Sequence, residues 1–158
     1  MKKLIDIVYD ASLLFAAQMS VACLIAYLLG QLFANYYNLP LPYIDALWCV
    51  ISAVVVMQDH RDQTLKAGFG RLKGSLLGAF VSAIYLTLFG VGLWVFFLIC
   101  FSLIVIASLA QIQEELRLGV LSAAVIYVVS VVSHPNNYWV TSFDRLLESV
   151  IGIVVALA

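Results

Sequence analysis

The feature that most constrains this chain is a succession of long apolar segments with few positions left for charge. Hydrophobic residues make up 65% of the 158 residues and charged residues 11%, whereas about 25% of a soluble domain is charged. A soluble fold of this size exposes much of its surface to water, so it could not hide so many apolar side chains. Because a helix satisfies its own backbone hydrogen bonds in lipid, the sequence predicts an all-α integral membrane protein.

Six apolar segments are candidates for membrane-spanning helices, each of which needs about 20 residues. They cover residues 11–34, 44–58, 74–89, 93–112, 116–133 and 143–158. Residues that favour turns separate them, among them Pro40, Gly90 and Pro135. The longest polar stretch, residues 59–73, is expected to be a loop. The whole of 1–158 is therefore predicted to form one transmembrane domain with six spans.

The distribution of basic residues predicts the orientation of the spans. Lysine and arginine are enriched in cytoplasmic loops. A cytoplasmic N-terminus places seven of the eight basic residues on that side, namely Lys2, Lys3, Arg61, Lys66, Arg71, Lys73 and Arg117. Arg145 is the exception, and it stands beside Asp144 in the sequence. We therefore expect both termini in the cytoplasm.

Two parts of the chain share a pattern. Residues 71–78 and 145–152 both read Arg-Leu-x-x-Ser-apolar-apolar-Gly, at an offset of 74, and residues 50–55 resemble 120–125 at an offset of 70. Three spans written twice cross the membrane in opposite senses, because three is odd. The pattern predicts a 3+3 inverted repeat of the kind found in many secondary transporters. The alternative is a likeness of composition between two apolar helices.

Small residues recur every four positions in the third segment and return in the sixth. They are Gly70, Gly74, Gly78, Ser82 and Gly152. Such a stripe lets another helix backbone approach closely, so we expect helix packing there. A broken helix that binds substrate is the alternative.

Several function classes are not expected. A net charge of −1 offers no electrostatic footprint for nucleic acid. The apolar segments contain no cluster of nucleophile, base or paired acids, so no enzyme and no cofactor is expected. Cys23, Cys49 and Cys100 stand singly, and we expect no metal site.

The likeness to a known family rests on one motif in each half of the chain and on residues that precede the motif of the first half. These are Trp48, residues 51–58, Thr64, Leu65, Gly68, Arg71-x-x-Gly74-Ser75-x-x-Gly78, and Arg145-Leu146 with Gly152. Together they resemble the fusaric acid resistance and aromatic acid exporter family, over essentially the whole chain as one six-span unit.

The resemblance implies efflux of aromatic or other organic carboxylate anions across a bacterial inner membrane. It also allows a periplasmic adaptor protein as a partner. Longer family members are similar to two such units with soluble domains attached. The chain is therefore expected to be either a truncated protein or a half-size unit that a homo-oligomer completes. Membrane lipids are the other expected partner.

Carboxylate substrates require positive charge along their path, and charge within a membrane should face protein or a water-filled cavity. Arg71 and Arg145 are the leading candidates, each expected in the first turn of a helix where the helix dipole would add to the attraction. Lys66 and Lys73 are expected to widen the inner funnel electrostatically. Alternatively, Arg71 and Lys73 are ordinary topology determinants.

Two further polar residues are candidates for the path. Glu148 is either an ion-pair partner of Arg145 or a carboxylate that couples transport to protons. Gln58 either makes hydrogen bonds between helices or lines a pore. Two other functions stay open beside an exporter: a passive organic-anion channel and a scaffold or accessory subunit that transports nothing.

Overall fold

The computed structural model describes residues 2–58, 60–111, 113–133 and 137–158, with side chains from residue 13 onward except within 112–116. All regular secondary structure in this part of the chain is helical. The helices are α1 (Lys2–Tyr36), α2 (Pro42–Val56), α3 (Arg61–Phe89), α4 (Leu93–Leu109), α5 (Gln113–Ser133) and α6 (Tyr138–Leu157). The predicted all-α class is confirmed.

Local sequence explains where several helices begin and end. Proline stands in the first turn of α2, where its missing N–H is not needed. Asn137 precedes α6 and its Oδ1 accepts a hydrogen bond of 2.9 Å from the backbone N of Trp139. Gly90 follows α3 with a φ of 71°, a left-handed conformation that glycine adopts without strain.

Some predicted boundaries were wrong. Residues 61–73, expected to be a loop, form the first part of α3. A helix accommodates most of their polar side chains on its exposed side, while Thr64, Gly68 and Arg71 lie on its buried side. The sixth helix begins at Tyr138 and not at 143. Arg71 and Arg145 therefore lie beyond the first turn of α3 and α6, and a helix-dipole contribution at these positions is not supported.

Among the residues that the structure describes, length and composition allow two helical stretches to cross a membrane, Leu13–Tyr36 of α1 and all of α3. The helices α2 and α4, and Arg117–Ser133 of α5, are apolar but shorter. The remaining helix, α6, has 20 residues and carries Asp144, Arg145 and Glu148. The helix α6 is therefore long enough to cross a membrane, and its three charged residues lie close together in the sequence.

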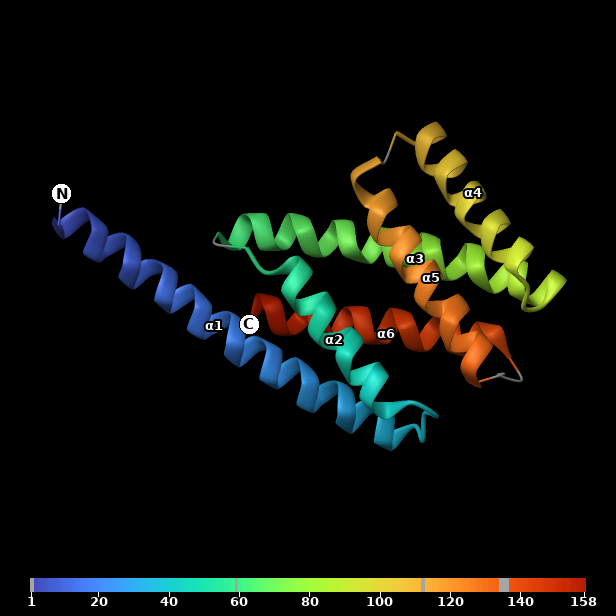
Figure 1. Ribbon diagram of the computed structural model, residues 1–158, viewed down its shortest axis with the longest axis horizontal. Coiled ribbons are helices and arrows are strands. Elements are labelled where there is room, and N and C mark those ends of the chain that lie inside the picture. The colour runs from blue at the N-terminus through green and yellow to red at the C-terminus, as the bar shows by residue number, and fades with distance from the viewer. Residues whose placement is uncertain (1, 59, 112, 134–136) are drawn as a thin grey trace.

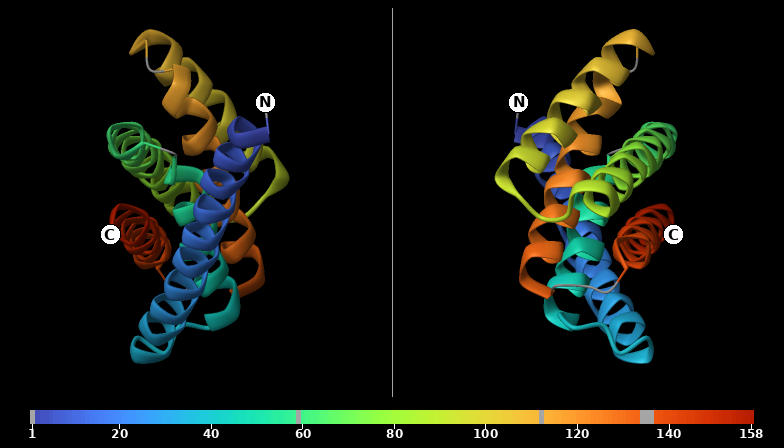
Figure 2. Two further views of the ribbon diagram at one scale, coloured as in Figure 1. Left: turned by 90° about the vertical axis from the view of Figure 1, so that its left-hand side faces the viewer. Right: turned by 90° about the vertical axis from the view of Figure 1, so that its right-hand side faces the viewer.

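The helices α3 and α6 pack side by side at the centre and run in opposite directions (Figure 1). The helix α2 packs on α6, and α5 packs on α3. The outer helices are α1, against α2 and α6, and α4, against α5 and α3. In the views of Figure 2, α4 lies at one extremity of the bundle and the turn between α1 and α2 at the other.

The described interior is unusually polar and the described exterior apolar. On α6 the buried residues are mostly polar, whereas Phe143, Val150 and Val154 face outward. On α3, four of the eleven buried residues are polar or charged, namely Thr64, Arg71, Ser75 and Ser82. This distribution is the reverse of a soluble protein and suits a bundle surrounded by lipid.

Glycines allow the four central helices to approach closely. A Cβ on Gly78 would overlap the carbonyl oxygen of Gly119 in α5 and stand 3.2 Å from the backbone N of Ala123. A Cβ on Gly152 would overlap the carbonyl oxygen of Cys49 in α2. The contacts of α3 with α5 and of α6 with α2 are thus backbone contacts.

Candidate functional site

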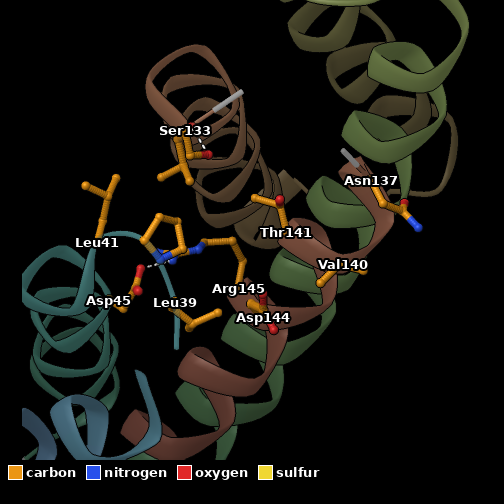
Figure 3. Close-up of a pocket in the computed structure, with 11 residues that line it drawn as sticks. Leu39, Leu41, Asp45, Ser133, Asn137, Val140, Thr141, Asp144 and Arg145 are labelled. Atoms are coloured by element: carbon orange, nitrogen blue, oxygen red, sulfur yellow. Dashed lines mark hydrogen bonds and ion pairs between the residues drawn. The ribbon is translucent and has the colours of Figure 1, made fainter. Parts of the chain in front are cut away.

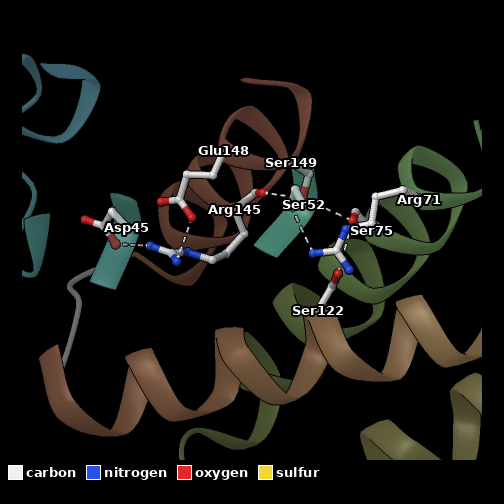
Figure 4. A network of polar contacts seen from close by, with 8 residues as sticks. All are labelled: Asp45, Ser52, Arg71, Ser75, Ser122, Arg145, Glu148 and Ser149. Carbon is white, nitrogen blue, oxygen red and sulfur yellow. Dashed lines mark hydrogen bonds and ion pairs between the residues drawn. The ribbon is translucent and has the colours of Figure 1, made fainter. Parts of the chain in front are cut away.

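A line of buried polar side chains runs through the centre of the bundle, where α2, α3, α5 and α6 meet (Figure 4). We call it the polar seam. Its members are Asp45, Ser52, Arg71, Ser75, Ser122, Arg145, Glu148 and Ser149. Each is at most 7% exposed.

Helical periodicity places these residues on one face of each helix. Asp45 and Ser52 are seven residues apart on α2, which is two turns and about 10 Å along its axis. On α6, Arg145 and Ser149 are one turn apart, as Arg71 and Ser75 are on α3. The seam therefore has two ends, each with one arginine, joined by serines.

At one end of the seam, Arg145 binds two carboxylates. Its Nη2 donates a hydrogen bond to Oδ1 of Asp45, and its Nη1 lies 2.7 Å from Oε2 of Glu148, three residues further along α6. The side chains of Asp45 and Glu148 are 2% and 1% exposed. This cluster of one guanidinium and two carboxylates has a net charge of −1 when all three groups are ionised.

At the other end, Arg71 lacks such partners among the described residues. Its Nη2 donates a hydrogen bond of 3.2 Å to Oγ of Ser52. Its Nε and Nη1 are buried and bond to no described group. At 2% exposure, Arg71 is a buried cation beside hydroxyls rather than beside a described carboxylate.

A short chain of serine hydroxyls lies between the two ends and reaches the backbone of Arg145. Oγ of Ser75 lies 3.1 Å from Oγ of Ser122 and 3.2 Å from Oγ of Ser149. Ser149 donates to the backbone oxygen of Arg145 at 3.0 Å. Because each hydroxyl has one hydrogen, Ser75 then donates to Ser149 and Ser122 donates to Ser75.

Cavities lie near opposite ends of α2. One, of about 320 Å³, is lined by Asp45, Thr141, Asp144 and Arg145 together with residues 39–41 (Figure 3). We call it the acidic cavity.

The other, of about 330 Å³, is lined by Gln58, Lys66, Ala67 and Gly70 among others. We call it the basic cavity. Both volumes are at the small end of the range of about 300–1,000 Å³ for ligand pockets.

The structure brings most of the predicted path residues into these places. Arg71, Arg145 and Glu148 belong to the polar seam. Gln58 and Lys66 line the basic cavity. Lys73 is exposed, and lines neither cavity.

Sequence reasoning missed five seam residues, namely Asp45, Ser52, Ser75, Ser122 and Ser149. A signal existed for two of the serines, because Ser75 and Ser149 are the shared serines of the repeated motif. Asp45 also carried one, since an acid beside an apolar run is costly in lipid. Its pairing with a residue 100 positions away left no trace in the sequence.

Comparison with known proteins shows the family of the chain. The family model described as fusaric acid resistance protein-like matches residues 21–158. No curated protein and no solved structure matches the chain. The matched range contains every member of the polar seam and every described lining residue of both cavities. The chain therefore belongs to the fusaric acid resistance protein-like family of membrane proteins, which is associated with transport and resistance.

Proposed function

We propose that this protein exports organic carboxylate anions, aromatic acids in particular, across the bacterial inner membrane along the polar seam. The observation that carries the proposal is Arg71, a buried guanidinium with two nitrogens that bond to no described group. An ion buried without a partner costs several kcal/mol in a protein interior. A substrate carboxylate is a partner that would offset this cost.

The surroundings of Arg71 suit a carboxylate ligand. Guanidinium groups bind carboxylates through two parallel N–H···O bonds, from Nη2 together with either Nε or Nη1. Nε and Nη1 of Arg71 have no described partner, and Nη2 has a second N–H beside the one that it donates to Ser52. The hydroxyl of Ser52 accepts a hydrogen bond from Arg71 and can donate its own hydrogen to a bound anion. Arg145 is less suitable, because two carboxylates already bind it.

The two cavities support a direction of transport. Lys66 lines the basic cavity, which is next to the first turns of α3, where Arg61 is also exposed. Asp45 and Asp144 line the acidic cavity. A basic mouth attracts anions and an acidic mouth repels them. With the basic end in the cytoplasm, as the positive-inside rule favours, anions enter from the cytoplasm and leave outward.

The proposal includes six spans arranged as an inverted repeat. Gly78 packs on Gly119 and Ala123, and Gly152 packs on Cys49 and Ala53. Gly152 follows Gly78 by 74 residues. Gly119 and Ala123 follow Cys49 and Ala53 by 70 residues. These are the offsets of the sequence pattern.

The cavities follow the same offset. Ala67 and Gly70 line the basic cavity, and Thr141 and Asp144, 74 residues later, line the acidic cavity. Matching cavities at opposite ends of a repeat are what alternating access requires. A second copy of the chain, packed through the apolar exterior, would complete a half-size unit.

Transport in proteoliposomes tests the proposal. We would measure efflux of radiolabelled benzoate and fusaric acid from vesicles that contain the native protein, Arg71→Gln or Lys73→Gln. Lys73 is the matched control, since it is two residues away, carries the same charge and is exposed. We expect saturable flux that Arg71→Gln abolishes and Lys73→Gln retains.

Three outcomes would contradict the proposal. Equal flux through native protein and Arg71→Gln would remove Arg71 from the path. Flux that does not saturate would indicate a passive channel. Absence of flux from folded native protein would indicate a scaffold or accessory subunit.

A further inference from the structure

We infer that Asp45 and Glu148, held by Arg145, form a proton-binding site, and that binding of one proton there is linked to binding of an anion at Arg71. The inference rests on the proposed function, because it takes Arg71 as the anion site. It adds a second ligand, the proton, and places it at the other end of the polar seam.

Charge counting motivates the site. With all groups ionised, Asp45, Glu148 and Arg145 sum to −1 and Arg71 contributes +1, so the seam as a whole is neutral. When an anion binds Arg71, that positive charge is offset and the excess carboxylate is no longer balanced. A proton on the carboxylate pair restores neutrality. In a buried site, where charges are weakly screened, such a balance has a large effect on binding.

The separation of the two ends allows the linkage without direct contact. Ser52, which bonds Arg71, and Asp45, which bonds Arg145, are about 10 Å apart along α2. The hydroxyls of Ser75 and Ser149 lie between the two ends, and their hydrogen bonds run from α3 to the backbone of Arg145. An anion at one end and a proton at the other can therefore bind together.

The groups that face the carboxylate pair are few. Cys49 is the other titratable residue on the buried side of α2, and Asp144 stands beside Arg145 on α6. From α3 the nearest charge is Arg71. Residues 13–36 of α1 carry no charge, and Arg117 of α5 is exposed. Among described side chains, Arg145 is thus the one cation that contacts the pair.

A route for the proton is present. Asp45 and Arg145 line the acidic cavity, whereas Glu148 lies one turn deeper on α6. Asp45 and Glu148 both bind the guanidinium of Arg145. A proton from the cavity can therefore bind at Asp45 without crossing the apolar part of the bundle, and one proton there removes the excess negative charge of the cluster.

The sign of the linkage follows from charge balance. A bound proton favours the anion, and a bound anion favours the proton to the same extent, since linkage of equilibrium binding is reciprocal. Anion affinity should therefore rise as pH falls. For one linked proton, the dissociation constant changes by up to about tenfold per pH unit.

Calorimetric titration of the purified full chain tests the inference. The probe is benzenesulfonate, whose own charge does not change between pH 5 and 8, with benzoate as the carboxylate reference. Titration in buffers of different ionisation enthalpy gives the number of protons taken up per anion. We expect up to one proton per anion and tighter binding at low pH in the native protein.

Two variants and one control complete the test. In Glu148→Gln the seam has lost the excess carboxylate, so the anion should bind tightly with little dependence on pH and without proton uptake. Asp45→Asn should behave in the same way, and serves if the first variant does not fold. Asp144→Asn removes an equal charge outside the pair and should keep the native pH dependence.

The outcomes separate the inference from the proposed function. Anion binding that is independent of pH in the native protein would overturn the inference and leave the transport proposal intact. Full pH dependence in both Glu148→Gln and Asp45→Asn would do the same. Absence of anion binding at every pH, from a folded native protein, would overturn both.

Discussion

Arg71 and Arg145 occupy the same position of a repeated motif, yet their surroundings differ in charge. Arg145 contacts two carboxylates, one from its own helix and one from α2. Arg71 contacts a serine hydroxyl. Part of the difference is local, because the motif has Glu148 in its second copy where Gly74 stands in the first. A cation that is already neutralised can support structure and proton binding, whereas one without a carboxylate is available to a ligand.

The largest expected effect concerns the stability of the Arg145 end. In Arg145→Gln, Asp45 and Glu148 would face each other without a cation, and breaking a buried pair typically costs about 3–5 kcal/mol. We expect a large fall in the melting temperature of the purified protein in detergent. The matched change is Arg71→Gln, which removes a cation that has no described carboxylate partner. It should not lower stability and should raise it, since it removes a buried ion that has no described carboxylate to offset its cost; equal losses in the two variants would contradict the comparison.

A second effect tests whether the close helix contacts near the two arginines, at Gly78 and Gly152, are equivalent. Gly78→Ala and Gly152→Ala would each force a Cβ into a backbone carbonyl oxygen of the neighbouring helix. Overpacking of this kind costs about 1–3 kcal/mol. We expect similar losses of thermal stability in both variants. The control is Gly92→Ala, where the nearest atom to a Cβ would be 3.7 Å away. A loss of stability at only one of the two packed glycines would show that the two helix contacts differ.

A third effect concerns the serine hydroxyls that lie between the two ends. Ser75 bonds both Ser122 and Ser149, and loss of one hydrogen bond typically costs about 0.5–1.5 kcal/mol. Ser75→Ala should therefore lower stability modestly and weaken the pH dependence of anion binding. Ser82→Ala is the control, since Ser82 is buried on the same helix and its Oγ bonds to no described group. An unchanged pH dependence in Ser75→Ala would exclude the serines from the linkage.

The smallest effect concerns the mouth of the path. Lys66→Gln should raise the substrate concentration needed for half-maximal transport by less than about tenfold at low salt, because an exposed charge steers anions without binding them. The effect should vanish at high ionic strength, where exposed charges are screened. Loss of transport by Arg71→Gln should persist there. A salt-independent effect of Lys66→Gln would make Lys66 a binding residue instead.

Sequence reasoning located the two arginines but only part of their contacts. Both were recognised because charge among apolar segments is costly, and because the motif repeats. The prediction that they lie in the first turn of a helix was wrong. For Arg71, the reason is that the polar residues 61–73, which suggest a loop, form the beginning of α3. Glu148 could be proposed as a partner of Arg145 because three residues separate them on one helix. Asp45 could not be proposed as a partner, because no feature of the sequence near Asp45 indicates a contact with α6.

The amino-acid sequence by itself determined that this protein lies in lipid and is helical. A chain with 65% hydrophobic residues and six apolar segments is compatible with lipid, and in lipid a single chain of this kind must form helices to satisfy its backbone. Only the tertiary structure decided which arginine is neutralised. The packing of α2 against α6 brings Asp45 to Arg145, and a charge at that distance in the sequence exerts its effect only when folding removes the water between the two groups.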